Sequence, residues 1–139
     1  MTTGLKDKVL AVISDHQIGT LATIRGQKPY SRFMIFYNDD LTLFAASNSQ
    51  TIKVDDMKQN PHVHILLGYG GDKLHDNYVE MEATASIEES QELKNKFWNE
   101  SLKRWIPSAD DPEYVLLRFT PDSILYYEEA GKEPQELSL

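Results

Sequence analysis

The chain has 139 residues, enough for one domain with one substantial core. It contains no cysteine, which excludes disulfide bonds and thiol chemistry. Its formal net charge of −8 disfavours binding to nucleic acid or to an anionic membrane surface, although a local site for one phosphate is compatible with it. No apolar run approaches a membrane span, and the N-terminus lacks the apolar core of a signal peptide, so we expect a cytosolic protein.

The chain opens with a helix and two strands. Apolar residues at helical spacing predict an amphipathic helix over residues 3–15, with a threonine before it as the cap. Residues 18–24 are rich in apolar and β-branched side chains and predict a strand. The turn residues 25–29 then lead into an antiparallel partner strand that begins at Tyr30.

The central stretch of the sequence, residues 31–61, begins with a predicted β-hairpin. Two apolar runs of strand length, Ser31–Tyr37 and Leu41–Ala46, flank the sequence Asn38-Asp39-Asp40. Asparagine and aspartate favour turns because their side chains bond to the nearby backbone. We therefore expect the two runs to pair with each other.

A polar loop, Ser47-Asn48-Ser49-Gln50, follows the hairpin and leads into a predicted helix over residues 51–57, which Asn60-Pro61 ends. A helix N-terminus offers unpaired N–H groups and the positive end of the helix dipole, so it can bind an anion. Thr51 and Lys53 lie in this first turn. The same residues also fit an ordinary connection, in which a loop side chain caps the helix and the lysine is solvated.

The second half of the chain adds further strands and one long helix. The predicted elements are strands over residues 63–69 and 78–87, a helix over residues 88–104, and strands over residues 114–120 and 123–128. We expect Pro121-Asp122 to form a turn and residues 129–139 to be a loosely held acidic tail. Six or seven strands in hairpin succession fit a Greek-key-like barrel better than any alternation of strands and helices.

The central stretch also resembles a known family. The order Arg32-x-Met34-Ile35, a hairpin, Ser47-Asn48-Ser49-Gln50-Thr51-Ile52-Lys53 and Asn60-Pro61 resembles the flavin-binding stretch of the pyridoxamine 5'-phosphate oxidase-like FMN-binding split barrels. The similarity extends from about Leu5 to Glu128 and is greatest with the general stress protein branch. It implies a mainly β fold with flanking helices, a six- to seven-stranded antiparallel Greek-key split β-barrel, in one domain of residues 1–139.

The resemblance implies FMN as the cofactor, with FAD as the alternative. The residues that it assigns to the flavin phosphate are Arg32, Thr51 and Lys53. Those that it places along the isoalloxazine edge are Phe33, Met34, Ile35, Ala46, Ser47 and Asn48. From the residues alone, Arg32 shares a strand face with Met34, and a guanidinium is costly to bury there without an anion, although it could also point to solvent.

The family resemblance further implies a homodimer with flavin at the interface. Four large aromatic residues lie in the C-terminal half, and their ordinary role is packing in the core or between subunits: Trp98, Trp105, Tyr126 and Tyr127. We expect Trp105 and Tyr127 to reach the flavin of the partner subunit.

The sequence departs from the family's oxidases at several positions. Tyr37 stands where those enzymes often carry a lysine, and Ile52 where they often carry an arginine, which predicts a less basic phosphate site and leaves FAD open. The vitamin B6 oxidases end in a basic segment that binds the substrate phosphate, whereas this chain ends in Tyr126-Tyr127-Glu128-Glu129 and an acidic tail. A vitamin B6 oxidase is therefore not expected.

Three functions stay open from the sequence. They are a flavin-dependent oxidoreductase using NAD(P)H or a small substrate, a flavin carrier or sensor in a stress response, and a structural dimer without cofactor. No substrate can be named, and no catalytic residue, because no Asp, Glu or His in residues 31–61 occupies a position that demands a role. His62-x-His64, with Asp72, His75 and Asp76 beyond the next turn, favours surface histidines over a metal site.

Overall fold

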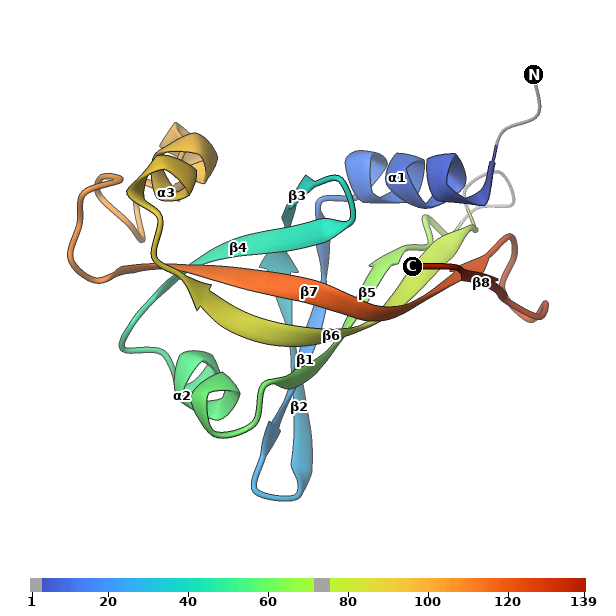
Figure 1. The fold of residues 1–139 in the computed structure, drawn as a ribbon, viewed down its shortest axis with the longest axis horizontal. Coiled ribbons are helices and arrows are strands. Elements are labelled where there is room, and N and C mark those ends of the chain that lie inside the picture. Colours follow the sequence, from blue (N-terminus) through green and yellow to red (C-terminus); the bar gives the residue numbers. More distant parts are fainter. Residues whose placement is uncertain (1–3, 72–75) are drawn as a thin grey trace.

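The fold is a strongly curled antiparallel sheet with helices at its margins, in a computed structural model that describes residues 4–71 and 76–139 (Figure 1). Its elements in chain order are α1 (Leu5–Asp15), β1 (Ile18–Arg25), β2 (Lys28–Ile35), β3 (Tyr37–Asp39), β4 (Thr42–Asn48), α2 (Ile52–Gln59), β5 (His62–Gly68), β6 (Tyr78–Glu88), α3 (Gln91–Phe97), the 3₁₀ turn η1 (Glu100–Leu102), β7 (Tyr114–Tyr127) and β8 (Gln135–Leu137).

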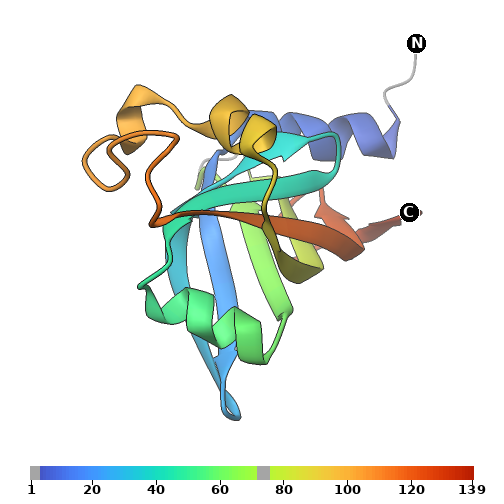
Figure 2. The same cartoon turned by 60° about the vertical axis from the view of Figure 1, so that its left-hand side comes forward.

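The strands follow the order β2-β1-β5-β6-β7-β4-β3, and β8 pairs with β7. All the pairs are antiparallel. The sheet curls so far that β4 and β7 run across the direction of β1 and β2, giving a half-barrel (Figure 1 and Figure 2). The predicted mainly β, antiparallel architecture with flanking helices is confirmed.

The predicted hairpin of residues 31–46 is wrong in its first strand. That segment belongs to β2, which pairs along its whole length with β1. At Phe36 the chain changes partner: its N–H donates to the carbonyl of Gln17 at 2.7 Å, and its ring is buried in the core. Only the short β3 that follows pairs with β4. Because Phe36 enters the core, one apolar run serves two strand pairings.

The predicted turn at Pro121-Asp122 is also wrong, because β7 is one continuous strand. Pro121 pairs with Ala83 and Ser123 with Glu82, so Asp122 is the extra residue of a β-bulge. Proline lacks the N–H of a regular ladder and is tolerated at such bulges. The Asp122 carboxylate accepts a hydrogen bond from the hydroxyl of Thr84 at 2.8 Å, which holds the bulge against β6.

The second predicted helix is shorter than expected, since α3 ends at Phe97 and only the short η1 follows. Asn99 causes the break. Its side-chain oxygen accepts from the N–H of Ser101, and its amide donates to the hydroxyl of Tyr37 at 2.8 Å. A side chain that bonds the local backbone in this way competes with helix continuation.

Both chain ends differ in detail from the prediction. The first helix begins at Leu5 with Gly4 as its N-cap, and the predicted threonine cap lies outside the described residues. In the acidic tail, residues 135–137 form β8 on β7, so this part of the tail is held by strand pairing. The sequence Gln135-Glu136-Leu137 shows no alternation of polar and apolar residues that would predict a strand.

Two apolar clusters fill the fold. The larger lies inside the curled sheet and is covered by α1 through Val9, Val12 and Ile13. The smaller lies beneath α3 and consists of Phe44, Phe97, Ile106, Tyr114 and Leu116. In this second cluster the rings of Phe44 and Phe97 stack with centroids 4.7 Å apart. It fixes the segment after η1 against β4.

Candidate functional site

A pocket of about 400 Å³ lies where the ends of β2 and β4, the start of α2 and the segment after η1 come together. Its lining residues are Ile18, Phe33, Met34, Ile35, Ala46, Ser47, Asn48, Thr51, Lys53, Leu102, Trp105 and Ile106. The walls are mostly apolar, and the polar side chains come from the end of β4 and the start of α2. Such a composition is typical of sites for small molecules and cofactors.

The structure brings together all but two of the predicted site residues in this pocket. The two that do not line it are Arg32 and Tyr127. Sequence analysis missed Ile18, Leu102 and Ile106. Ile18 could have been found from the β1–β2 register, in which it stands opposite Ile35. Leu102 and Ile106 reach the pocket through the irregular chain after α3, which no sequence period predicts.

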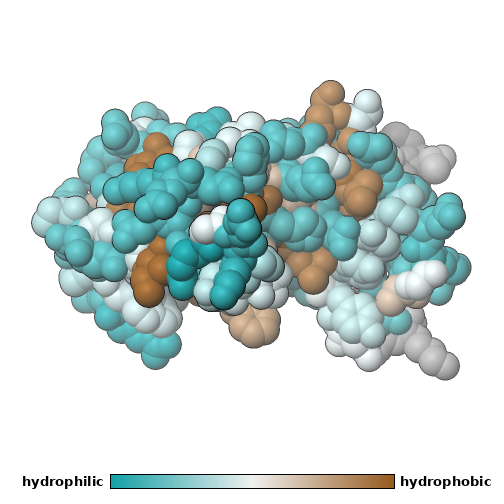
Figure 3. Space-filling view, turned by 90° about the horizontal axis from the view of Figure 1, so that it is seen from below, coloured by the Kyte–Doolittle hydropathy of each residue, from teal (hydrophilic) through white to brown (hydrophobic). Residues whose placement is uncertain are grey.

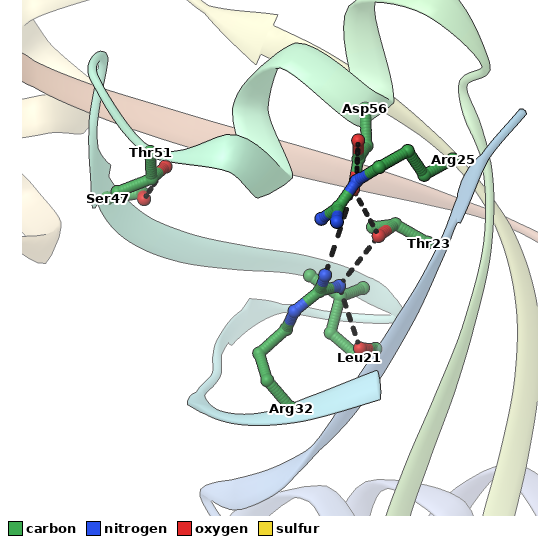
Figure 4. Close-up of polar contacts among 7 residues, drawn as sticks. All are labelled: Leu21, Thr23, Arg25, Arg32, Ser47, Thr51 and Asp56. Atoms are coloured by element: carbon green, nitrogen blue, oxygen red, sulfur yellow. Dashed lines mark hydrogen bonds and ion pairs between the residues drawn. The ribbon is translucent and has the colours of Figure 1, made fainter. Parts of the chain in front are cut away.

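The start of α2 forms the polar end of the pocket. Thr51 is the N-cap residue, but its side chain makes no capping bond; its hydroxyl instead donates to the carbonyl of Asn48 at 2.9 Å. The hydroxyl of Ser47 lies 3.3 Å from that of Thr51 (Figure 4). The first N–H groups of α2 therefore lack a side-chain cap, and two hydroxyls lie beside them.

Lys53 is half-buried in the wall of this polar end. Burial, and secondarily the positive charge of Arg32, lower the pKa of its ammonium group. Within the residues that the structure describes, no carboxylate lies at ion-pair distance from it. A half-buried cation beside an uncapped helix N-terminus favours an anion in the pocket.

The loop between β4 and α2 is fixed by Glu113, the residue before β7. The Glu113 carboxylate accepts hydrogen bonds from the side chains of Ser49 and Gln50, and these bonds lower its pKa. The N–H of Ser49 donates to the Glu113 carbonyl at 2.9 Å, and the N–H of Gln50 donates to the Asn48 side chain. The polar end of the pocket is thus held in shape by the protein itself.

Arg32 points toward β1 and α2 rather than into the pocket or out to solvent. Its Nη1 donates to the carbonyl of Leu21 at 3.1 Å and to the hydroxyl of Thr23 at 2.8 Å (Figure 4). Its Nη2 lies 3.9 Å from the carboxylate of Asp56. Burial is the main cause that lowers the pKa of this guanidinium. Its contact with a bound phosphate stays a prediction.

Asp56 has a structural role that the sequence analysis, which looked for catalytic groups, did not anticipate. Its side chain is only 5% exposed and accepts hydrogen bonds from Arg25 at 3.1 and 3.2 Å and from Thr23 at 3.2 Å. The bonds from Arg25 are the largest cause that lowers its pKa. A sequence signal existed, because Asp56 lies between the apolar positions Val54 and Met57 of one short helix.

The four aromatic residues have different environments. Tyr126 packs in the main core, and Trp98 packs beside the second cluster, as the packing alternative predicts. Trp105 is 54% exposed at the pocket. Tyr127 lies at the other end of β7 from the pocket, where its ring stacks on Tyr78 at 4.4 Å. Within one protomer it does not reach the pocket.

The two positions that depart from the family's oxidases lie outside the pocket lining. The hydroxyl of Tyr37 accepts from Asn99, and its ring stacks near Phe97 with centroids 5.9 Å apart. Ile52 is 62% exposed on the first turn of α2. The basic character of the polar end therefore depends on Lys53 and the nearby arginines.

The described parts of the chain contain no group of three His, Asp or Glu side chains that could hold a metal ion. His62 is exposed and His64 half-buried on β5. Asp72 and His75 lie outside the described residues. Among the helices described, none is long and apolar enough to cross a membrane.

Comparison with known proteins identifies the family. Residues 5–128 match the pyridoxamine 5'-phosphate oxidase family. General stress protein 26 of Bacillus subtilis (strain 168) is 42% identical over 135 residues, which cover 97% of this chain and 96% of that protein. The crystal structure of general stress protein 26 from Bacillus anthracis str. Sterne superposes with a TM-score of 0.87 at 44% identity, covering 99% of this chain and 100% of that one.

A more distant structure has the same fold. A heme binding protein from Mycobacterium smegmatis superposes with a TM-score of 0.81 at 13% identity, covering 99% of this chain and 59% of that one. At this identity the likeness concerns the split-barrel fold alone. The family match and the two stress protein relatives confirm the resemblance seen in the sequence. The chain belongs to the pyridoxamine 5'-phosphate oxidase family, in its general stress protein branch.

Proposed function

We propose that the pocket binds a flavin, FMN rather than FAD, and that the protein is a flavin-dependent oxidoreductase working with NAD(P)H or a small substrate. One observation carries the proposal: Lys53 is half-buried beside the uncapped N-terminus of α2, at the polar end of an otherwise apolar pocket. A flat apolar ring system bearing one terminal phosphate matches this division of the pocket.

The lining residues fit such a ligand. The apolar side chains of Met34, Ala46, Leu102 and Ile106 can contact a ring system, and the volume of about 400 Å³ lies within the usual range for small-molecule sites, roughly 300 to 1,000 Å³. Backbone groups at the end of β2 can bond to the ring edge. The pocket has a single compact polar end, which favours the one phosphate of FMN over the pyrophosphate of FAD.

Each part of the pocket has a distinct task in this proposal. Lys53 binds the phosphate by charge, and Thr51 binds it by its hydroxyl once that hydrogen turns away from the carbonyl of Asn48. The apolar walls exclude water, and Trp105 covers the exposed side of the ring. A bound flavin supplies hydride and electron transfer, while the protein supplies binding and orientation. We assign no catalytic residue.

The fold by itself does not decide between flavin and haem as the cofactor, so the choice depends on the side chains that line the pocket. Haem iron is held by His, Cys or Tyr, or by Met beside a His. The described pocket lining has no His, Cys or Tyr, and Met34 is its only sulfur ligand. These side chains favour flavin over haem.

A flavin carrier or sensor in the stress response is the second candidate function. Lys53 is the only ionisable side chain in the described lining, and because it is assigned to the phosphate, no second ionisable group there is left for general acid or base catalysis. A vitamin B6 oxidase activity is not proposed, because the end of the chain is acidic where a substrate phosphate would need a basic partner.

We also propose that two copies of the chain assemble, with the flavin at their interface. Phe33 is 78% exposed and Ile18 is 64% exposed, and both lie at the pocket. On the face shown in Figure 3, apolar surface forms separate areas among hydrophilic residues. Large apolar side chains at the edge of a cofactor site are typical of an interface that closes it.

The experiment begins with the purified protein. If it is yellow, it is denatured and the released flavin is identified by mass, which separates FMN from FAD. Bleaching of the bound flavin by NAD(P)H without oxygen supports the oxidoreductase, and a yellow protein that NAD(P)H does not bleach supports the carrier or sensor. A colourless protein that also fails to bind added FMN or FAD contradicts flavin binding and leaves the structural dimer.

A further inference from the structure

We propose that Asp56 is a positioning residue for the phosphate end of the pocket: acting through Thr23, it holds Arg32 beside Lys53 and so raises the affinity for the flavin phosphate. The inference rests on the proposed function. It assigns a role to a buried carboxylate that does not line the pocket.

The hydroxyl of Thr23 links Asp56 to Arg32 (Figure 4). It donates its one hydrogen to the Asp56 carboxylate at 3.2 Å and accepts from Nη1 of Arg32 at 2.8 Å. Thr23 is fully buried, so water cannot replace either partner. Because the hydrogen is committed to Asp56, a lone pair of the hydroxyl faces Arg32. The carboxylate therefore sets the direction in which Thr23 can accept.

Arg25 keeps Asp56 itself in place. Its Nε and Nη2 donate to the two carboxylate oxygens at 3.1 and 3.2 Å, a bidentate pairing that fixes the plane of the carboxylate. Arg32 is attracted by the same carboxylate, but at 3.9 Å its Nη2 is too far for a hydrogen bond. Asp56 thus attracts Arg32 toward α2 but does not accept a hydrogen bond from its Nη2.

Arg32 keeps donors for a further anion. A guanidinium has five N–H groups. The two on Nη1 are used by Leu21 and Thr23, and those on Nε and Nη2 have no hydrogen-bond partner among the described residues. A phosphate oxygen can accept from these groups once the free side of Arg32 turns toward the pocket, which Arg32 does not itself line.

The charges of the group also favour an anion. Arg25 and Arg32 flank the carboxylate of Asp56, and Arg32 also acts on Lys53, so these four side chains together carry an excess of two positive charges. Burial is the larger cause that lowers the pKa of Lys53, and the positive charge of Arg32 adds to it. A phosphate dianion would neutralise the excess and remove this repulsion.

Two effects of Asp56 on an anion have opposite signs, which makes the inference decidable. By Coulomb's law alone, removing the negative charge of Asp56 should strengthen the binding of a phosphate nearby. If Asp56 acts by positioning Arg32, removing it should weaken that binding. Whether an Asp56 variant binds FMN more tightly or more weakly therefore separates the Coulomb effect from the positioning effect.

The test compares Asp56→Asn with Asp55→Asn, which removes the same charge from the exposed neighbouring residue. Apoprotein of each is titrated with FMN and with riboflavin, which lacks the phosphate, and folding is checked by thermal unfolding. We expect Asp56→Asn to weaken FMN binding about tenfold and to leave riboflavin binding unchanged. Asp55→Asn should bind both flavins as the wild type does.

A second variant, Thr23→Val, removes the linking hydroxyl and keeps the charge of Asp56. It should show the same selective loss of FMN affinity, and it decides the question if Asp56→Asn does not fold. Unchanged or tighter FMN binding in a folded variant would overturn the inference, as would an equal loss for both flavins. A wild-type protein that binds neither flavin would overturn the proposed function as well.

Discussion

Lys53 and Asp56 lie one turn apart on α2, and the helix directs the first to the pocket and the second to β1. The ammonium group of Lys53 has no carboxylate beside it in the described structure, whereas the carboxylate of Asp56 is fully hydrogen-bonded. One short helix therefore both binds the sheet and presents a cation to a ligand. Any change in how α2 sits on β1 moves the polar end of the pocket.

Lys53→Ala should weaken FMN binding by about 1.5 to 3 kcal/mol, the range of a charge-assisted hydrogen bond. Riboflavin binding should change little, because the lost contact is with the phosphate. Calorimetric titration of the apoprotein measures both affinities. Lys58→Ala, an exposed lysine on the same helix, is the control. Wild-type FMN affinity in Lys53→Ala would remove Lys53 from the site.

Arg32→Ala should weaken FMN binding by a similar amount, about 1.5 to 3 kcal/mol. The physical reason is the loss of the second cation near the phosphate, together with its free N–H groups. The same titration applies, with thermal unfolding to confirm that the contacts of Arg32 with β1 are not needed for folding. An unchanged affinity would show that Arg32 serves only the packing of α2 on the sheet.

Trp105→Ala should weaken flavin binding by about 1 to 2 kcal/mol through loss of ring contact. Dimerisation, if spread over many residues, should change much less. Light scattering beside flavin titration measures the two quantities.

Tyr127→Ala tests the prediction that this residue reaches the flavin of a partner, since within one protomer it lies away from the pocket. A monomer that binds flavin with full affinity would contradict the dimer proposal.

Sequence patterns predicted the secondary structure well where the period was regular. Phe33–Ile35 and Ala46–Asn48, which the motif assigned to the flavin ring, lie at strand ends and line the pocket. Pro121 and Phe36 show where patterns fail. A proline in a bulge looks like a turn, and an apolar run that changes partner at one buried ring looks like a single strand. Strand partners are set by the whole sheet, which a local period does not describe.

The interpretation of Arg32 shows a second limit. Sequence analysis left open whether Arg32 faces an anion or solvent, and in the structure it faces the carboxylate of Asp56, on the next helix. The two meet only because α2 packs on β1. Such a pairing between distant segments has no characteristic residue spacing that would reveal it in the sequence. The signal that did exist was local, an aspartate between two apolar helix positions.

Gly19→Ala should destabilise the fold by about 1 to 3 kcal/mol through overpacking. Gly19 lies where β1 approaches β5, and an added Cβ would come within 2.5 Å of the carbonyl oxygen of Leu66 and clash with the side chain of Leu67. Urea unfolding of the variant and the wild type gives the difference in the free energy of unfolding. Equal midpoints would mean that β1 and β5 can separate at little cost.

Tyr114 should make the fold sensitive to high pH. Burial raises its pKa to about 12, and its hydroxyl donates to the carbonyl of Lys94 at 2.9 Å. In the unfolded state the tyrosine phenol ionises at about pH 10. The stabilising contribution of Tyr114 is therefore complete below pH 10 and is lost as the pH rises toward 12.

Thermal unfolding of the wild type and of Tyr114→Phe between pH 8 and 12 measures this effect. The melting temperature of the wild type should fall more steeply above about pH 10 than that of the variant, which has no phenol to ionise. Every other ionisable group is the same in both proteins, so the difference between the two curves isolates Tyr114. Parallel curves would mean that the Tyr114 hydroxyl is accessible to water.

The position of β7 in the sheet has a consequence for biosynthesis. Within the described structure β4 pairs only with β3 and β7, and its pocket residues Ala46 and Asn48 stand opposite Leu116 and Tyr114. A nascent chain can therefore complete this wall only after β7 has left the ribosome, and β7 begins at Tyr114 whereas β4 ends at Asn48. Until then the apolar faces of the earlier strands have no closing partner. A cofactor would consequently be acquired late in synthesis, and ribosome stalling before Tyr114 should expose the chain to chaperones and proteases.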